Sequence, residues 1–280
     1  MERVEALRVV GDIAADQWGL FTTKQAEAAG VNRTTLTRLA SAGLVDHMAR
    51  GVHLVVAAGA PSHVEEKAAW LRLAPSRRAW ERAPTDEDNG VFSHRTACVL
   101  HGLGDIPAPR VEITVPRRRT TRISGIWLHR GDLSQDEVTA TNDGLPVTTV
   151  ERTIKDLLVA HVDGGHVGGV LNDALRRQLV DQQRLLALLG KHATAYGIDV
   201  NDGLRLLLHL LRQAGADAAF LSRSAVTEHA DTRLETTSAA HAIAAQLAGL
   251  DLAQLKKLRA AVNAAIDEPG KNNPEPEPEQ

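Results

Sequence analysis

The chain has 280 residues and a net charge of −3, and 43% of its residues are hydrophobic but only 3% are aromatic. This length suits two domains better than one small domain, and leucine, valine and alanine must fill a core that is mostly helical. The lone cysteine, Cys98, excludes an internal disulfide and a cysteine-rich metal cluster. We find no apolar run long enough to cross a membrane and no signal peptide, so we expect a cytoplasmic protein without a membrane partner.

The net negative charge by itself argues against nucleic-acid binding, but the charges are unevenly distributed along the chain. Residues 20–60 carry four basic and two acidic side chains, and residues 110–130 carry six arginines and one acid. Acidic residues elsewhere offset these two zones, including five in the segment that starts at Asp267. The two basic zones are therefore the candidate nucleic-acid surfaces.

The N-terminal sixty residues show the spacing of a winged helix-turn-helix. Gly30 and Gly43 are placed to end two short helices, and Asn32 is placed to cap the second. A hairpin with Arg50 and Gly51 at its turn follows and predicts a wing. The expected elements are a helix over 4–18, short helices over 24–29 and 33–41, and strands over 44–49 and 52–56.

In such a unit the second short helix enters the major groove and the wing contacts the backbone or minor groove. Arginine can read guanine, asparagine can read adenine, and threonine can contact phosphate or a thymine methyl group. A small helical unit for protein contacts is the alternative reading of the same pattern. The predicted DNA-binding residues are Thr23, Lys24, Asn32, Arg33, Thr34, Thr35, Thr37, Arg38 and Arg50.

The rest of the chain predicts an α/β domain that becomes helical. We expect strands over 110–115 and 125–130, and a capping box of Thr148 and Glu151 that opens a helix. The predicted fold class is α+β and mostly helical, in which an α/β domain with a small antiparallel sheet follows the winged helix. The expected domains are 1–60, 61–266 and a disordered acidic tail over 267–280. Helices are expected over 62–73, 94–101, 166–179, 181–193, 201–214, 239–247 and 251–266.

A search for an active site yields no catalytic residue, metal site or cofactor, so we do not expect an enzyme. His94, Cys98 and His101 share one predicted helix, but no carboxylate is near them in the sequence, and Cys98 has the character of a small core residue. The acids between 163 and 266 mostly stand at helix starts, where they cap, rather than in a cluster that holds a divalent ion. A nuclease is therefore disfavoured.

The segment GLFTTKQAEAAGVNRTTLTRLASAGLVDHMARGVHLV resembles the N-terminal winged-helix domain of AbiEi-type antitoxins. His53 stands where that family usually has tyrosine, which removes a packing ring. The blocks FSHRTACVLHGL, VEITVPRRR and GLPVTTVERTIKDL resemble successive parts of the family's second domain, so the likeness covers about the first 160 residues.

The resemblance implies a bacterial antitoxin whose first domain represses its operon by binding double-stranded operator DNA. It also implies a functional partner, a nucleotidyltransferase-like toxin, which the second domain counters with or without a stable complex. Arg117, Arg118, Arg119 and Arg122 lie in a predicted hairpin loop, which is either a solvated turn or a phosphate-facing patch. We hypothesise that this patch serves the antitoxin activity. The alternative is a winged-helix regulator without a toxin, whose helical half dimerises or senses a ligand.

Overall fold

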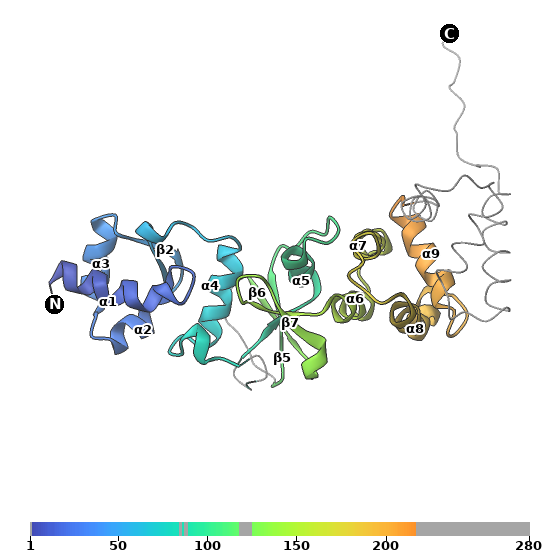
Figure 1. Cartoon of the computed structure of the whole chain (residues 1–280), viewed down its shortest axis with the longest axis horizontal. Helices are drawn as coiled ribbons and strands as arrows, with labels where there is room; N and C mark the ends of the chain where they lie inside the picture. The colour runs from blue at the N-terminus through green and yellow to red at the C-terminus, as the bar shows by residue number, and fades with distance from the viewer. Residues whose placement is uncertain (1, 84–85, 87–88, 118–124, 217–280) are drawn as a thin grey trace, which may run out of the picture. The chain divides into compact units, whose positions relative to one another are not determined.

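A computed structural model describes residues 2–83, 86, 89–117 and 125–216, and Figure 1 labels its elements. The chain divides into two compact units, residues 1–180 and 181–280. Within the described residues it is a mixed α/β protein with nine α-helices, a three-stranded sheet and a five-stranded sheet. Three expected segments lie outside the described residues: the helices over 239–247 and 251–266 and the tail over 267–280.

The N-terminal elements follow an order compatible with a winged helix-turn-helix. Strand β3 lies between β1 and β2, and both pairings are antiparallel. Strand β1 was not expected, because three residues are too few for a readable alternation. The elements are α1 (Arg3–Ala15), β1 (Leu20–Thr22), α2 (Thr23–Ala28), α3 (Arg33–Ser41), β2 (Val45–Ala49) and β3 (Val52–Val55).

Local capping explains where the short helices begin and end. The Thr22 hydroxyl accepts from the backbone of Gln25, whose side chain reciprocates, and Asn32 accepts from the backbone of Thr35. Gly30 and Gly43 take positive φ values of 86° and 68°. Both glycines follow a helix, where a left-handed residue ends the hydrogen-bond ladder most easily.

The five-stranded sheet is mixed, so the expectation of an antiparallel sheet in the domain after the N-terminal elements is wrong, and the small antiparallel sheet is the three-stranded one. Strand β5 (Val111–Val115) pairs with β6 (Ile126–Arg130) in parallel, with Val111 opposite Ile126 and Val115 opposite Arg130. The connector between them is therefore a crossover and not a hairpin loop. Alternating hydrophobicity predicts that a strand exists but contains no information about the direction of its neighbour.

The remaining strands complete the order β6-β5-β4-β8-β7, in which β4 also pairs in parallel with β8. Helix α6 begins after Thr149, whose hydroxyl accepts from the backbone of Arg152. The expected Thr148 cap is one residue early, because Thr148 is still paired within the sheet. The elements are α4 (Val64–Leu73), β4 (Val91–Phe92), α5 (His94–His101), β7 (Val138–Ala140), β8 (Pro146–Thr148), α6 (Val150–Val159) and α7 (Gly164–Arg176).

Helix α4 connects the two sheets through one hydrophobic core. Leu20 and Leu54 of the small sheet, Trp70 and Leu71 of α4, and Phe92 of the large sheet belong to the same buried cluster. Figure 1 shows α4 between the N-terminal elements and strand β6. The expected boundary at residue 60 thus falls inside the first compact unit.

A buried lysine links the same elements by polar contacts. Lys67 of α4 is 1% exposed, forms an ion pair with Asp143 and donates to the carbonyl oxygen of Ser62 at 2.8 Å. Its ammonium group lies 5.5 Å from the ring centre of Trp18, and the indole of Trp18 donates to the Asp143 carbonyl at 2.6 Å. Asp143 therefore joins α4 to the segment between α1 and β1.

The described part of the second unit is a helical pair, α8 (Gln182–His192) and α9 (Gly203–Gln213), joined through a short 3-10 turn at Ala193–Tyr196. Asp181 and Asp202 cap the two helices by accepting from the backbones of Arg184 and Arg205. The helices approach closely at Gly203, where a Cβ atom would lie 1.9 Å from the carbonyl oxygen of Leu186.

Replacing Gly203 with alanine will destabilise this helical pair by about 1–3 kcal/mol, because the added methyl group meets backbone and not a movable side chain. Thermal unfolding of the full chain, followed by circular dichroism, measures the effect. The matched control is Gly11→Ala in α1, where an added Cβ meets nothing within 4 Å. That substitution should raise stability by about 0.5–1 kcal/mol. Equal effects of the two substitutions would contradict the close approach.

Candidate nucleic-acid interface

Helix α3 buries one face and exposes the other. Leu36 and Leu39 are 4% and 0% exposed and pack beneath the helix, in the cluster that also holds Val10 and Ile13 of α1. The opposite face carries the predicted DNA-contacting residues. Of these, Asn32, Arg33, Thr34, Thr37 and Arg38 are exposed, and Thr35 is half-buried.

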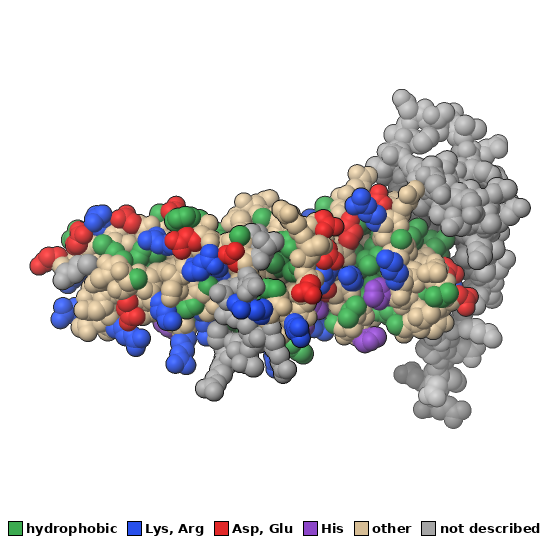
Figure 2. Space-filling view, turned by 90° about the horizontal axis from the view of Figure 1, so that it is seen from below, with side chains coloured by type: hydrophobic (Ala, Val, Ile, Leu, Met, Phe, Trp, Pro, Cys, Tyr) green, Lys and Arg blue, Asp and Glu red, His purple; other side chains and the backbone are tan. Residues whose placement is uncertain are grey.

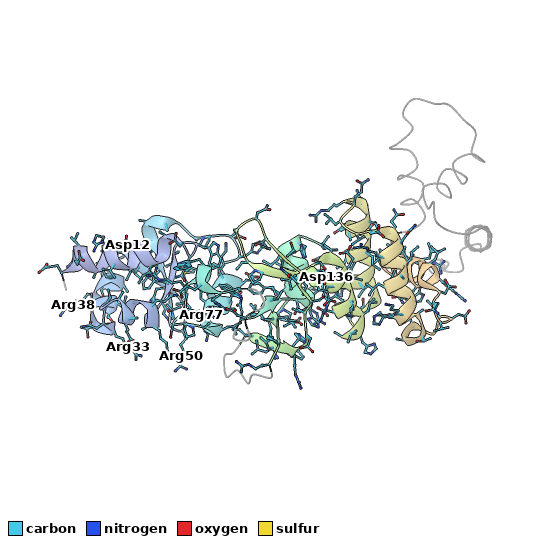
Figure 3. All side chains as sticks on the ribbon, turned by 60° about the horizontal axis from the view of Figure 1, so that its bottom comes forward. Asp12, Arg33, Arg38, Arg50, Arg77 and Asp136 are labelled. Atoms are coloured by element: carbon cyan, nitrogen blue, oxygen red, sulfur yellow. The ribbon has the colours of Figure 1, made fainter. Side chains whose placement is uncertain are left out.

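The other predicted DNA-binding residues lie on α2 and on the β2–β3 turn. Lys24 is exposed on α2, and Arg50 is exposed beside Gly51, which takes a φ of 77°. Figure 3 shows Arg33, Arg38 and Arg50 along one edge, with Asp12 on the opposite side of these N-terminal elements. Figure 2 shows lysine and arginine side chains repeated along the same lower margin. The structure thus places the predicted arginines on one side.

Several of these side chains already have partners. Arg33 pairs with Glu27 at 2.9 Å, but both side chains are exposed, at 81% and 39%, so water screens the pair. The Thr37 hydroxyl donates to the carbonyl oxygen of Arg33 at 3.0 Å. For Arg38 and Arg50, no carboxylate partner is found among the described residues. These two arginines can therefore meet phosphate or a base without breaking an ion pair.

A further basic side chain, Arg72, belongs to the helix that packs against the β2–β3 hairpin and is not among the predicted DNA-binding residues. Burial, and then repulsion from Arg50, lower the pKa of Arg72. Arg72 lies in the last turn of α4, the helix whose buried residues share a core cluster with Val52 and Leu54 of β3. Its sequence neighbourhood contains no nucleic-acid signal, so only the packing of α4 against the small sheet connects it with the hairpin.

Thr23 and His53 form a polar pair beneath the wing. The Thr23 hydroxyl lies 2.9 Å from Nε2 of His53, and the imidazole stacks on Phe21 with 5.2 Å between ring centres. The histidine at this position therefore still supplies a packing ring. Burial, and then the nearby His47, lower the pKa of His53.

The acid sensitivity of the N-terminal elements follows from that lowered pKa. The unfolded chain binds a proton near pH 6.5 while the folded state resists it, so the stability contributed by neutral His53 is lost as pH falls below about 6.5. We expect His53→Phe to lose less stability than the wild type between pH 7.5 and 5.5, as measured by urea denaturation. The control His209→Gln should keep the wild-type dependence. An unchanged pH dependence in His53→Phe would refute this assignment.

The second basic zone lies partly within the described residues, which include 110–117 and 125–130. Arg117 follows the end of β5, whereas Arg118, Arg119 and Arg122 lie outside the described residues. Because β5 and β6 are parallel neighbours, the end of β5 and the start of β6 lie at opposite ends of the strand pair. The segment that holds these arginines joins those two ends.

The three side chains considered as a metal or nucleophile site on α5 do not act together. Nε2 of His101 lies 2.7 Å from the carbonyl oxygen of Thr148. Cys98 is fully buried, and burial raises the pKa of its thiol to about 12, so it is a core residue and not a thiolate. His94 instead stacks on His129 of β6, with 3.7 Å between ring centres.

A carboxylate lies beside this histidine pair, although none is near in the sequence. Glu112 of β5 is 3% exposed, and its Oε2 atom lies 2.7 Å from Nε2 of His129. Its other oxygen accepts from Arg95 at 3.1 Å. Burial acts to raise the pKa of Glu112, but the bonds from His129 and Arg95 outweigh it and leave the pKa lowered. Burial, followed by His129, lowers the pKa of His94 to about 4.

Comparison with known protein families identifies one region of the chain. Residues 10–56 match the sequence profile of a family described as "Transcriptional regulator, AbiEi antitoxin". The resemblance predicted from the sequence is confirmed over these residues. The matched region includes α2, α3, β2, β3 and the arginines described above. A comparison with curated proteins found no match.

None of the helices in the described ranges is long and apolar enough to span a membrane.

Proposed function

We propose that this chain is an antitoxin that represses its own operon and neutralises a nucleotidyltransferase-like toxin. The observation that carries the DNA-binding half is the exposed face of α3, which bears Arg33 and Arg38 on the same side as Arg50. The match of residues 10–56 to an AbiEi antitoxin regulator family supports the same assignment. In this proposal residues 1–60 are the DNA-binding domain, 61–266 the antitoxin domain and 267–280 an acidic tail.

The proposed interface uses α3 as the recognition helix in the major groove. Arg38 reaches a base edge or a phosphate directly, whereas Arg33 exchanges the exposed ion pair with Glu27 for DNA. Arg50 contacts the adjacent backbone or minor groove from the hairpin turn. Further contacts to phosphate and base edges complete the interface. They come from Thr23, Lys24, Asn32, Thr34, Thr35 and Thr37.

The toxin-directed half of the proposal rests on the arginines at 117, 118, 119 and 122. Four arginines within six residues carry a local positive charge suited to phosphate. The expected target is an RNA or nucleotide connected with the toxin; the alternative is DNA that flanks the recognition site, and loss of promoter binding on removal of the arginines would indicate it. No cofactor and no catalysis are needed for either half.

Replacing these four arginines with serine will abolish protection against the toxin and leave promoter binding within about threefold of the wild type, a difference of less than 1 kcal/mol. Colony counts after co-expression with the product of the adjacent gene measure protection, and fluorescence anisotropy with promoter DNA measures binding. The control Arg38→Ala should show the reverse pattern. Full protection by the serine variant would refute the patch as the antitoxin surface. If the adjacent gene encodes no nucleotidyltransferase-like toxin, the chain is a regulator without a toxin partner.

A further inference from the structure

Two histidines and a glutamate from three different elements lie close together at the β6 edge of the large sheet. The potential ligand atoms of His94, Glu112 and His129 all lie within 4.8 Å of one another. They come from the start of α5, from β5 and from β6. Glu112 and His129 stand on adjacent parallel strands, with Thr114 directly opposite His129, so the sheet register fixes their spacing.

The backbone at His94 is held in a conformation that ordinary residues avoid. His94 takes a φ of 52°, in the left-handed region, at the first residue of α5. Such strain persists where the surrounding structure enforces it, and it collects at functional sites. Here the strained residue carries the imidazole that stacks on His129.

Hydrogen bonds around the cluster orient its donor atoms as in a metal site. Nδ1 of His94 lies 2.9 Å from the Ser93 hydroxyl, which accepts from Thr114 at 2.8 Å. Because Nδ1 is engaged in this contact, Nε2 is the nitrogen that remains for a ligand. Arg95 holds Oε1 of Glu112 and leaves Oε2 for an ion. Polar groups that fix the orientation of histidine and carboxylate ligands in this way are typical of protein metal centres.

We propose that His94, Glu112 and His129 form a binding site for one divalent transition-metal ion of the zinc type. Two imidazole nitrogens and one carboxylate oxygen are a ligand set that Zn²⁺, Co²⁺ and Ni²⁺ accept, with water in the remaining position. Nε2 of His129 and Oε2 of Glu112 are 2.7 Å apart and now share a hydrogen bond. The metal ion replaces the proton of that bond, and rotation of the imidazole of His94 out of its present stack on His129 turns Nε2 toward the same ion.

The exchange is balanced in protons. Binding needs the Nε2 lone pair of His129, so the proton on Nε2 moves to Nδ1 of a neutral imidazole or leaves to solvent from a cationic one, and no oxidant or reductant is involved. The carboxylate of Glu112 partly neutralises the ion, while Arg95 stays on its other oxygen. The His129 side chain is 21% exposed, so an ion can enter from this side.

An exposed tryptophan provides a local signal for the site. Trp127 is 51% exposed and stacks on His129, with 5.5 Å between ring centres and 7° between ring planes. A paramagnetic ion such as Co²⁺ bound to His129 will quench the fluorescence of Trp127. The visible absorption of Co²⁺ reports the coordination geometry. Neither signal depends on DNA binding or on toxin neutralisation, so this inference is tested separately from the proposed function.

The experiment titrates CoCl₂ into the full-length, tag-free protein after treatment with a chelator, and then displaces Co²⁺ with ZnCl₂. We expect about one ion per chain, a visible Co²⁺ band and quenching of Trp127. His129→Gln and Glu112→Gln should each weaken Co²⁺ binding by at least about tenfold to a hundredfold. His94→Asn should do the same without added backbone strain, because asparagine tolerates the left-handed conformation.

Two control variants separate this site from general histidine binding. His47→Gln removes one member of the other histidine ring pair described, His47 with His53, and should leave Co²⁺ affinity unchanged. Trp127→Phe should remove the quenching but keep the bound ion. The His129 side chain is partly exposed, so we expect His129→Gln to fold normally. Unchanged Co²⁺ binding in this variant would overturn the proposal. Absence of a Co²⁺ band in the wild type would overturn it equally.

Discussion

Simultaneous replacement of Arg33, Arg38 and Arg50 with alanine is expected to weaken binding to promoter DNA by about a hundredfold or more at physiological salt. The three side chains project from α3 and from the hairpin turn along one edge. Each arginine contact to phosphate or to a base contributes about 1–3 kcal/mol, so the summed loss is at least about 3 kcal/mol. Fluorescence anisotropy with a labelled promoter fragment measures the affinity.

Salt dependence separates a lost contact from a damaged fold. Each phosphate contact that is removed lowers the slope of log K against log salt by about 0.9, so the triple variant should bind with a slope shallower by up to about 3. The control Arg8→Ala removes an arginine that pairs with Glu5 and Asp12 on α1, and it should leave both affinity and slope unchanged. If Arg8→Ala weakens binding as much as the triple variant, the interface is elsewhere.

Replacing Lys67 with methionine is expected to destabilise residues 1–180 by about 1–3 kcal/mol, because it removes the buried partner of an ion pair and leaves Asp143, whose side chain is 31% exposed, without it. Lys67 is 1% exposed and contacts Asp143, the Ser62 carbonyl and the Trp18 ring. The loss therefore loosens the attachment of the N-terminal elements to α4. Urea denaturation followed by tryptophan fluorescence measures it, since Trp18 lies 6.0 Å from Trp70 and both report on this junction.

A double variant identifies the cause of that loss. Adding Asp143→Asn to Lys67→Met removes the stranded carboxylate, so the double variant should be more stable than Lys67→Met. The matched control is Lys155→Met, whose side chain is 43% exposed and pairs with Glu137 at 3.5 Å, and which should change stability by less than about 1 kcal/mol. A loss in Lys67→Met no larger than in this control would show that the buried pair is not important for stability.

Sequence patterns predicted the elements of residues 1–60 well because the determinants there are local. The expected helix over 33–41 coincides with α3, and Asn32 caps it as expected. Gly30 ends the preceding short helix with the positive φ that the turn requires. Caps, glycines and helical periodicity act within a few residues, so they can be read from a single sequence.

The large sheet and the polar cluster were beyond such patterns. The segments 110–115 and 125–130 were recognised as strands, but their parallel pairing depends on a chain crossover that hydrophobic alternation does not encode. In the sequence Glu112 is only the single acid of a basic zone, and His129 belongs to no motif that indicates a site. Parallel pairing with α5 packed beside it brings both to His94, from positions 18 and 35 residues away.

The sequence by itself therefore determined the spacing of the two short helices, the residues on the outer face of α3 and the likeness to AbiEi antitoxins over residues 10–56. Only the tertiary structure decided that Arg33, Arg38 and Arg50 share one edge, that Lys67 is buried against Asp143, and that His94 meets Glu112. The physical reason is the range of the interactions. Helix caps and turns depend on neighbouring residues, whereas strand direction and buried charge pairing depend on segments that meet only when the core forms.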